Sequence, residues 1–360
     1  MREYIFILGR EPELSFLELI SYFKGNGIDY KIIKHEKEVV VILLDEKLDF
    51  GSMLNKLGGI VKIGETFKEY VYKGNLNKLN YGISVYKGRD ELTNILKKEY
   101  KKEKVKAMLR KPRDKVFMPS EILSKNLFEF LIFNDYKART IAFFNPKEYK
   151  KRDETRPKQM FLHQVSLRLS KILINLSQAR NSLLDPFCGN GTILQEGMLN
   201  NLDVVGIDID QESVDATKEN LEWINEKFGI NKKFKIIKGD ATKLTRYLKR
   251  NSVEAIASEP DLGPYFRKMP GKEEVEKAIN QLDKMYYEFL LQSHEILKKN
   301  GKIAIIFPRL KYRNGRKSLD VKDLLKRTGF KVSIIDSRVK LPLITEGKFL
   351  DREIYVLEKA

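Results

Sequence analysis

Cysteine and histidine are scarce in this sequence of 360 residues, which has one cysteine and three histidines. Because Cys188 has no second cysteine to pair with, no disulfide can form within the chain, and a zinc site built from thiolates is excluded. The histidines are scattered along the chain, so the sequence predicts no metal site and no metal-dependent mechanism.

Long hydrophobic runs are also lacking, and acidic residues are fewer than basic residues. No apolar stretch is long enough to span a bilayer, and charges interrupt the short apolar run in MREYIFILGREPELS at the start, so we expect a cytoplasmic protein without a signal peptide. Against 68 Lys and Arg stand 50 Asp and Glu, a formal net charge of +18. This excess favours a polyanionic partner, with nucleic acid as the first candidate; a lysine-rich solvated surface is the alternative.

The patterns along the chain indicate three parts. Residues 1–66 alternate strand and helix patterns in the order of a small ferredoxin-like α+β domain. Residues 67–150 include a basic helix pattern, and its run Lys97–Lys106 is either a solvated face or a surface for RNA. The charged stretch 145–159 has two prolines and no apolar period, which predicts a linker.

Strand and helix patterns alternate regularly over residues 156–360. Helices of this length between strands predict an α/β fold with a parallel, doubly wound, Rossmann-like sheet. The last two strand patterns, at 332–341 and 353–359, have no helix between them. They predict an antiparallel hairpin at one edge of the sheet.

The stretch LLDPFCGNGT (183–192) places an acid and two glycines after a strand pattern. Ligands of open α/β sheets bind beyond the carboxyl ends of the strands, where Asp185 is expected. Gly189 and Gly191 allow a tight turn and a close approach of the backbone to a ligand. Since the loop lacks the lysine of a phosphate cradle and does not match GxGxxG, we expect a nucleoside ligand with little phosphate.

Two more acids end the next two strand patterns. Asp208 ends VVGIDID, where a carboxylate can accept both hydroxyls of a ribose, and Asp240 ends IIKGD, where it can accept from an adenine amino group. A single acid after a strand is usually a helix cap, but three in succession fit a nucleoside lying across the sheet. S-adenosylmethionine fits this pattern, with its amino-acid end against Asp185.

The fourth strand pattern ends in ASEPDLGPYF (257–266). An exocyclic amine of a base becomes nucleophilic when acceptors hold its hydrogens and its lone pair turns out of the ring plane. A side-chain oxygen of Glu259 or Asp261, together with a backbone carbonyl beside the rigid Pro260, can supply those acceptors. Tyr265 or Phe266 offers an aromatic face for the base. The alternative is an acidic turn that only ends a strand.

LLDPFCGNGTIL, GIDID, GDAT and SEPDLGP together resemble the Rossmann-fold N-methyltransferases of RNA. The strongest likeness is to the THUMP-containing tRNA guanine-N2 methyltransferase family, which acts on guanosine 10. LGREPELSFLEL and GGIVKIGE in the first part are similar to that family as well. The resemblance implies a THUMP RNA-binding domain over 67–150, S-adenosylmethionine as cofactor and tRNA as partner. It leaves open a monomer or a complex with a small activating subunit, and one methylation or two.

The resemblance also implies roles for individual residues. The cofactor-binding residues it implies are Asp185, Phe187, Gly189, Gly191, Asp208, Ile209, Asp240 and Ala241. The candidate catalytic residues are Glu259, Pro260 and Asp261 of the fourth strand end, and the candidate substrate-binding residues are Tyr265, Phe266 and Arg309. Arg309 follows the strand pattern KIAIIFP, where it is either a contact for an RNA phosphate or a surface loop residue. The family's fourth motif usually reads Asp or Asn, Pro, Pro and an aromatic residue, whereas this chain has Glu259, Pro260, Asp261 and Leu262. Two alternatives stay open: a DNA amino-methyltransferase, and an RNA-binding homologue without catalysis.

Overall fold

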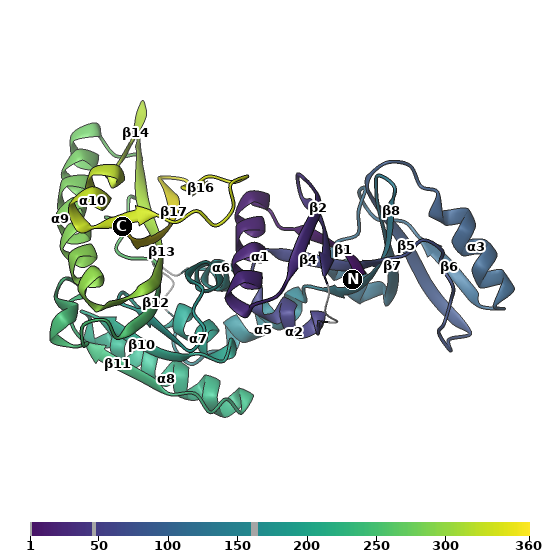
Figure 1. Cartoon of the computed structure of the whole chain (residues 1–360), viewed down its shortest axis with the longest axis horizontal. Helices are drawn as coiled ribbons and strands as arrows, with labels where there is room; N and C mark the ends of the chain where they lie inside the picture. Colours follow the sequence, from purple (N-terminus) through teal and green to yellow (C-terminus); the bar gives the residue numbers. More distant parts are fainter. Residues whose placement is uncertain (1, 45–47, 160–164) are drawn as a thin grey trace. The chain divides into compact units, whose positions relative to one another are not determined.

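The computed structural model describes residues 2–44, 48–159 and 165–360 (Figure 1). The chain forms two compact units, which are described separately. The first comprises Met1–Phe16 and Gly27–Glu154, and the second comprises Leu17–Asn26 and Thr155–Ala360. Among the described residues, no helix has the combination of length and apolar character that crossing a membrane requires.

The first half of the first unit alternates strands with helices. The elements along this part of the chain are β1 (Arg2–Leu8), α1 (Pro12–Asn26), β2 (Tyr30–Glu36), β3 (Val39–Leu44), α2 (Phe50–Lys56) and β4 (Ile60–Thr66). Of α1, only the residues up to Phe16 belong to this unit, and Leu17–Asn26 belong to the second. β1 pairs antiparallel with β3 on one side and with β4 on the other, and β2 pairs antiparallel with β3. The strands are rich in branched apolar residues, and Ile5, Val39 and Val41 are buried together in one core cluster.

The second half of this unit extends the same sheet. Its elements are β5 (Lys78–Lys87), α3 (Leu92–Lys102), β6 (Lys106–Arg110), α4 (Pro119–Lys125), β7 (Leu127–Phe133) and β8 (Tyr136–Phe143). β8 pairs with β4, which makes one sheet in the order β2-β3-β1-β4-β8-β7-β5-β6. In α3 the side chains of Leu92, Leu96 and Tyr100 are buried, so the lysines of the basic run between them face solvent.

The charged stretch that the sequence predicts as a linker is helical over α5 (Pro146–Thr155). The Asn145 side chain starts this helix by accepting the backbone N–H of Lys147 at 3.1 Å and by donating to the Glu148 carboxylate at 2.6 Å. Proline suits the first helical position because its missing N–H would be unpaired there in any case. The side chains of α5 are exposed or half-buried, which explains why no apolar period marks it in the sequence.

The second unit alternates helices with a mostly parallel sheet, as the sequence predicts. Its first elements are α6 (Leu167–Ser177), β9 (Ser182–Asp185), α7 (Thr192–Leu199), β10 (Asp203–Asp208), α8 (Gln211–Phe228), β11 (Phe234–Lys238), the 3-10 helix η1 (Ala241–Arg246), β12 (Val253–Ser258) and α9 (Lys272–Ile296). The remaining elements are β13 (Leu297–Tyr312), β14 (Gly315–Ser318), α10 (Val321–Thr328), β15 (Phe330–Val332), β16 (Leu343–Thr345) and β17 (Leu350–Lys359). The sheet order is β11-β10-β9-β12-β13-β17-β15, with parallel pairing from β11 through β13.

The C-terminal part of this sheet is antiparallel. β17 lies between β13 and β15 and pairs antiparallel with both, so an antiparallel pair closes the edge as expected. The strand predicted over 332–341 is wrong beyond Val332, because only Phe330–Val332 pairs with β17. The alternation of apolar residues misleads here: Ile334 is 81% exposed rather than part of a strand packed on the core. β16 pairs with β17 instead.

Candidate functional site

The carboxyl ends of four parallel strands lie side by side in the second unit. The register pairs Asp185 of β9 with Gly206 of β10, so Asp208 stands two residues beyond Asp185 at the same edge. Asp208 in turn pairs with Lys238 of β11, and Asp240 follows two residues later. The structure thus brings the three acids of the sequence motifs to one edge of the sheet.

The glycine loop after β9 is fixed by contacts to the neighbouring strand and helix. The Gly189 N–H donates to the Asp208 carboxylate at 2.8 Å, and the Thr217 hydroxyl of α8 donates to the Gly189 carbonyl at 2.6 Å. Gly191 begins α7 with φ at +80°, and a Cβ there would lie 2.9 Å from a Thr217 methyl carbon. Only glycine meets both conditions without strain, so Gly191 lets the loop pack closely against α8.

Asp185 is a buried carboxylate with two donors. Its Oδ1 accepts the Ser258 hydroxyl at 2.7 Å and the Phe187 N–H at 3.2 Å, and the residue is 2% exposed. Burial raises the pKa of Asp185 to about 7, against the hydrogen bonds that favour the charged form. Ser258, the last residue of β12, therefore links the first motif to the fourth, a role that the sequence motif alone does not reveal.

Asp208 and Asp240 differ in how their oxygens are used. Asp208 is half-buried and accepts the N–H groups of Gly189 and of Asp210, the latter at 3.0 Å. The next residue, Ile209, is an apolar side chain that is 71% exposed. Asp240 caps η1 by accepting the backbone N–H of Thr242 at 2.9 Å, and it also accepts the Thr242 hydroxyl at 2.6 Å, so the helix-cap interpretation holds for it.

The electrostatics of Asp240 follow from these contacts. Burial alone would raise the pKa of Asp240, but hydrogen bonds from Thr242 and Lys243 outweigh that effect and lower the pKa below its ordinary value. The carboxylate therefore stays charged at neutral pH. Ala241, which follows Asp240, is buried. In the loop after β9, Phe187 is mostly buried, and its ring packs edge-on against Phe289 at 5.1 Å between centroids.

The fourth motif contains an ion pair that the sequence does not reveal. The Arg352 guanidinium donates to Oε1 of Glu259 at 2.5 Å, and the Glu259 side chain is only 7% exposed. Arg352 lies on β17 opposite Pro308 of β13, 93 residues away from Glu259 in sequence. Sequence reasoning missed it because only the strand order β12-β13-β17 brings Arg352 near the end of β12.

Asp261 shapes the loop that follows the buried Pro260. Its carboxylate accepts the Gly263 N–H at 2.9 Å, and its backbone carbonyl lies 3.1 Å from the Tyr286 hydroxyl. Gly263 has φ at +99°, which suits glycine in this turn. A cavity of about 350 Å³ opens beside the turn and is lined by Asp261, Gly263, Pro264, Ala278, Gln281, Leu282 and Met285.

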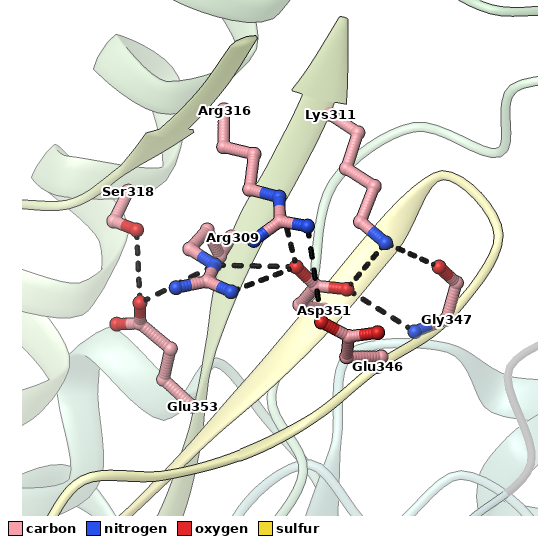
Figure 2. Close-up of polar contacts among 8 residues, drawn as sticks. All are labelled: Arg309, Lys311, Arg316, Ser318, Glu346, Gly347, Asp351 and Glu353. Atoms are coloured by element: carbon pink, nitrogen blue, oxygen red, sulfur yellow. Dashed lines mark hydrogen bonds and ion pairs between the residues drawn. The ribbon is translucent and has the colours of Figure 1, made fainter.

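The three residues expected to touch the substrate have different surroundings. Tyr265 is 67% exposed, whereas Phe266 is half-buried against the core of the unit. Arg309 donates from two nitrogens to the buried carboxylate of Asp351, at 3.0 and 3.2 Å (Figure 2). The Arg309 charge is thus already paired, and Tyr265 is the more exposed of the two aromatic side chains. Among the described residues no cluster of metal-binding side chains is found.

The chain is similar in sequence to known methyltransferases. A family model described as RMKL-like, methyltransferase domain matches residues 156–332, and one described as DNA methylase matches residues 16–219. A protein of Methanothermococcus thermolithotrophicus named "Probable tRNA (guanine(10)-N2)-dimethyltransferase" is 31% identical over 39% of this chain and 80% of its own length. The chain belongs to the methyltransferases, as a member of the tRNA (guanine(10)-N2)-dimethyltransferase family.

Two further members of this family agree with that placement. The Methanothermobacter thermautotrophicus tRNA (guanine(10)-N2)-dimethyltransferase is 27% identical, and the alignment covers 85% of this chain and 89% of that protein. The Pyrococcus abyssi enzyme of the same name is 32% identical over 53% of this chain, a match that spans about half, 51%, of that protein's length. TrmN from Thermus thermophilus shares the fold, with a TM-score of 0.52 at 15% identity over 99% of this chain and 100% of TrmN.

Proposed function

We propose that this chain transfers a methyl group from S-adenosylmethionine to the exocyclic N2 of a guanosine in tRNA, at position 10. The observation that carries the proposal is the single sheet edge on which Asp185, Asp208 and Asp240 lie beside the Ser258–Asp261 loop. The names of the relatives supply the nucleotide and its position.

The residues at this edge suit the parts of S-adenosylmethionine. The proposal assigns the methionine end to Asp185, Phe187, Gly189 and Gly191, the ribose to Asp208, and the adenine to Ile209, Asp240 and Ala241. Ile209 supports the assignment because a 71% exposed isoleucine offers an apolar face for a flat ring to cover. The Asn190 amide nitrogen in the loop is buried without a hydrogen-bond partner among the described residues, a donor suited to a carboxylate.

S-adenosylmethionine, when bound, supplies the methyl group from its sulfonium centre. The chain's own task is to hold the guanine amine. We assign the acceptor role to Glu259, because Arg352 fixes one of its oxygens and leaves the other for an N2 hydrogen. The Pro260 carbonyl is the second acceptor, and Tyr265 supplies the stacking face. Asp261, whose carboxylate closes the turn onto Gly263, positions the loop rather than the amine.

The proposal extends to the first unit. The order β1-α1-β2-β3-α2-β4, with its antiparallel pairing, supports a ferredoxin-like domain over residues 1–66. We assign residues 67–150 to a THUMP RNA-binding domain and residues 156–360 to the methyltransferase domain. The solvent-facing lysines of α3 supply positive charge for tRNA phosphates in this scheme.

The decisive experiment combines an unmodified tRNA transcript, the purified chain and S-adenosylmethionine with a labelled methyl group. Nucleoside mass spectrometry should find the label on N2 of guanosine, and a transcript with adenosine at position 10 should take up none. Label on another atom or nucleotide would contradict the proposal. The ratio of monomethyl to dimethyl guanosine measures whether one or two transfers occur.

A DNA amino-methyltransferase is the second candidate, because the DNA methylase model matches residues 16–219. Such an enzyme flips its target base out of the duplex and uses the same amine chemistry. Duplex DNA in the same assay separates the two: N6-methyladenine or N4-methylcytosine in DNA, with no label in tRNA, would favour this candidate.

A further inference from the structure

β13 extends beyond the carboxyl end of its parallel neighbour β12. Ser258, the last residue of β12, pairs with Ile305, and β13 goes on to Tyr312. These seven further residues extend about 23 Å beyond the carboxyl end of β12, at 3.3 Å per residue. β14 returns antiparallel to it, with Tyr312 opposite Gly315 (Figure 1). We call residues 309–318 the basic hairpin.

The basic hairpin stands at the edge of the sheet that carries Glu259. Near its base the Leu310 side chain approaches Gly263 of the catalytic loop, where a Cβ on the glycine would lie 3.6 Å from it. The Tyr286 hydroxyl lies 3.1 Å from both the Asp261 and the Ile306 carbonyls, which ties β13 to that loop a second time. These contacts therefore hold the base of the hairpin against the loop that contains the proposed amine site.

The sequence of the basic hairpin, RLKYRNGRKS, has five basic residues and no acid. Three of them converge on the fully buried carboxylate of Asp351 in β17 (Figure 2). Lys311 approaches it to 2.7 Å, Arg309 to 3.0 Å and Arg316 to 3.6 Å. Burial would raise the pKa of Asp351, but hydrogen bonds from Lys311 and Arg309 outweigh it and lower the pKa, so the carboxylate stays charged.

This cluster leaves the hairpin with positive charge facing outward. Arg316 is about half exposed, with its ion pairs at 3.6 and 3.8 Å. Arg313 and Lys317 are exposed, and no side-chain hydrogen bond or ion pair joins them to a residue that the structure describes. Like charges held close together repel one another, so a rigid concentration of them suits a polyanion as its partner.

We propose that the basic hairpin holds the phosphate backbone of the RNA next to the nucleotide whose base enters the Glu259 site. Arg313 and Lys317 make the outer phosphate contacts, and Asp351 fixes the hairpin through Arg309 and Lys311. This inference rests on the proposed function for the identity of the RNA. Under this proposal Arg309 makes no direct phosphate contact, and the exposed residues Arg313 and Lys317 make the phosphate contacts instead.

The test compares two double variants at opposite ends of β13. Arg313→Gln/Lys317→Gln removes two exposed charges from the hairpin, and Lys298→Gln/Lys299→Gln removes two exposed charges from the start of the strand. Binding of tRNA is measured between 50 and 200 mM salt, as conditions of the assay. Two lost phosphate contacts should reduce the slope of log K against log salt by about 1.4–1.8. The hairpin variant should also raise the KM for tRNA roughly tenfold or more.

The remaining readouts separate this proposal from the proposed function. S-adenosylmethionine binding should be unchanged in both variants, which also shows that they fold. The control variant should keep the wild-type slope and KM. A hairpin variant with the wild-type slope and KM overturns the hairpin proposal while the wild type still methylates tRNA. If the hairpin variant shows the reduced slope but the wild type methylates no tRNA, the proposed function is overturned and the hairpin contact remains supported.

Discussion

Replacing Arg352 should reveal how much the acceptor role of Glu259 depends on its ion pair. Arg352→Gln keeps a hydrogen-bond donor and removes the charge, and Arg352→Met removes both. The pair is 2.5 Å long, and the Glu259 side chain is 7% exposed, so water replaces the lost donor poorly. A hydrogen bond to a charged group contributes about 1.5–3 kcal/mol, which corresponds to a fall in kcat of roughly 10- to 150-fold for Arg352→Met.

The assay is methylation of tRNA at saturating S-adenosylmethionine, with kcat and KM resolved. Because Arg352 acts through Glu259, kcat should fall while cofactor affinity stays the same, and Arg352→Lys should recover part of the loss. Arg327→Gln is the matched control: Arg327 pairs with Asp323 at 2.7 Å on α10, a half-exposed pair of the kind that contributes about 0–1 kcal/mol. Wild-type kcat in Arg352→Met would refute the reasoning.

Three further predictions concern the cofactor edge. Asp208→Ala should weaken S-adenosylmethionine binding about tenfold or more, since charge-assisted hydrogen bonds contribute roughly 1.5–3 kcal/mol; unchanged binding by calorimetry would reject the ribose assignment. Because burial raises the pKa of Asp185 from its ordinary value of 3.8 to about 7, this carboxyl destabilises the fold increasingly from about pH 4 to pH 7. Asp185→Asn should therefore flatten the loss of stability between pH 5 and 8 in urea unfolding, by at most about 3 kcal/mol, and an unchanged pH dependence would contradict it. Gly191→Ala should lower stability by about 1–3 kcal/mol, from its positive φ and the contact with Thr217; an unshifted Tm would show that the loop adapts.

The periodic parts of the chain could be read from the sequence. Apolar strand patterns that each end in an acid located β9, β10 and β11, because a buried parallel strand and the loop beyond it are both encoded locally. The helices of the second unit followed from their apolar spacing in the same way. The sheet edge with its three acids was therefore predictable without coordinates.

Features that depend on long-range pairing were not predictable. Arg352 meets Glu259 only because β17 inserts between β13 and β15. The same strand brings Asp351 to Arg309, which turned an expected phosphate ligand into part of a buried cluster. Ser258 looked like an ordinary strand residue until the register placed its hydroxyl on Asp185.

Where the secondary structure differs from the prediction, the causes are local. The two units divide within the stretch predicted as a linker, between Glu154 and Thr155. The sequence did not reveal the helix α5 there, because an exposed helix needs no apolar period, only a cap such as Asn145 and a proline at its start. The strand expected over 332–341 had apolar residues in the right number, but the segment after Val332 leaves the sheet and exposes Ile334. The pattern of apolar residues predicts which side chains are buried, so it does not predict secondary structure well in segments that bury few side chains.

The central claim, that Glu259 holds the guanine amine for methyl transfer, is tested most directly by single-turnover methylation of tRNA at saturating S-adenosylmethionine. Glu259→Ala should lose several kcal/mol of transition-state stabilisation, roughly 100-fold or more in rate, while its cofactor binding stays at the wild-type level. Glu259→Gln, which keeps an acceptor oxygen, shows whether orientation alone suffices: a rate near wild type means that it does, and a loss like that of alanine means that the charge is needed. Asp261→Ala should retain more activity than Glu259→Ala. Full activity of Glu259→Ala would contradict the account and move the acceptor role to Asp261.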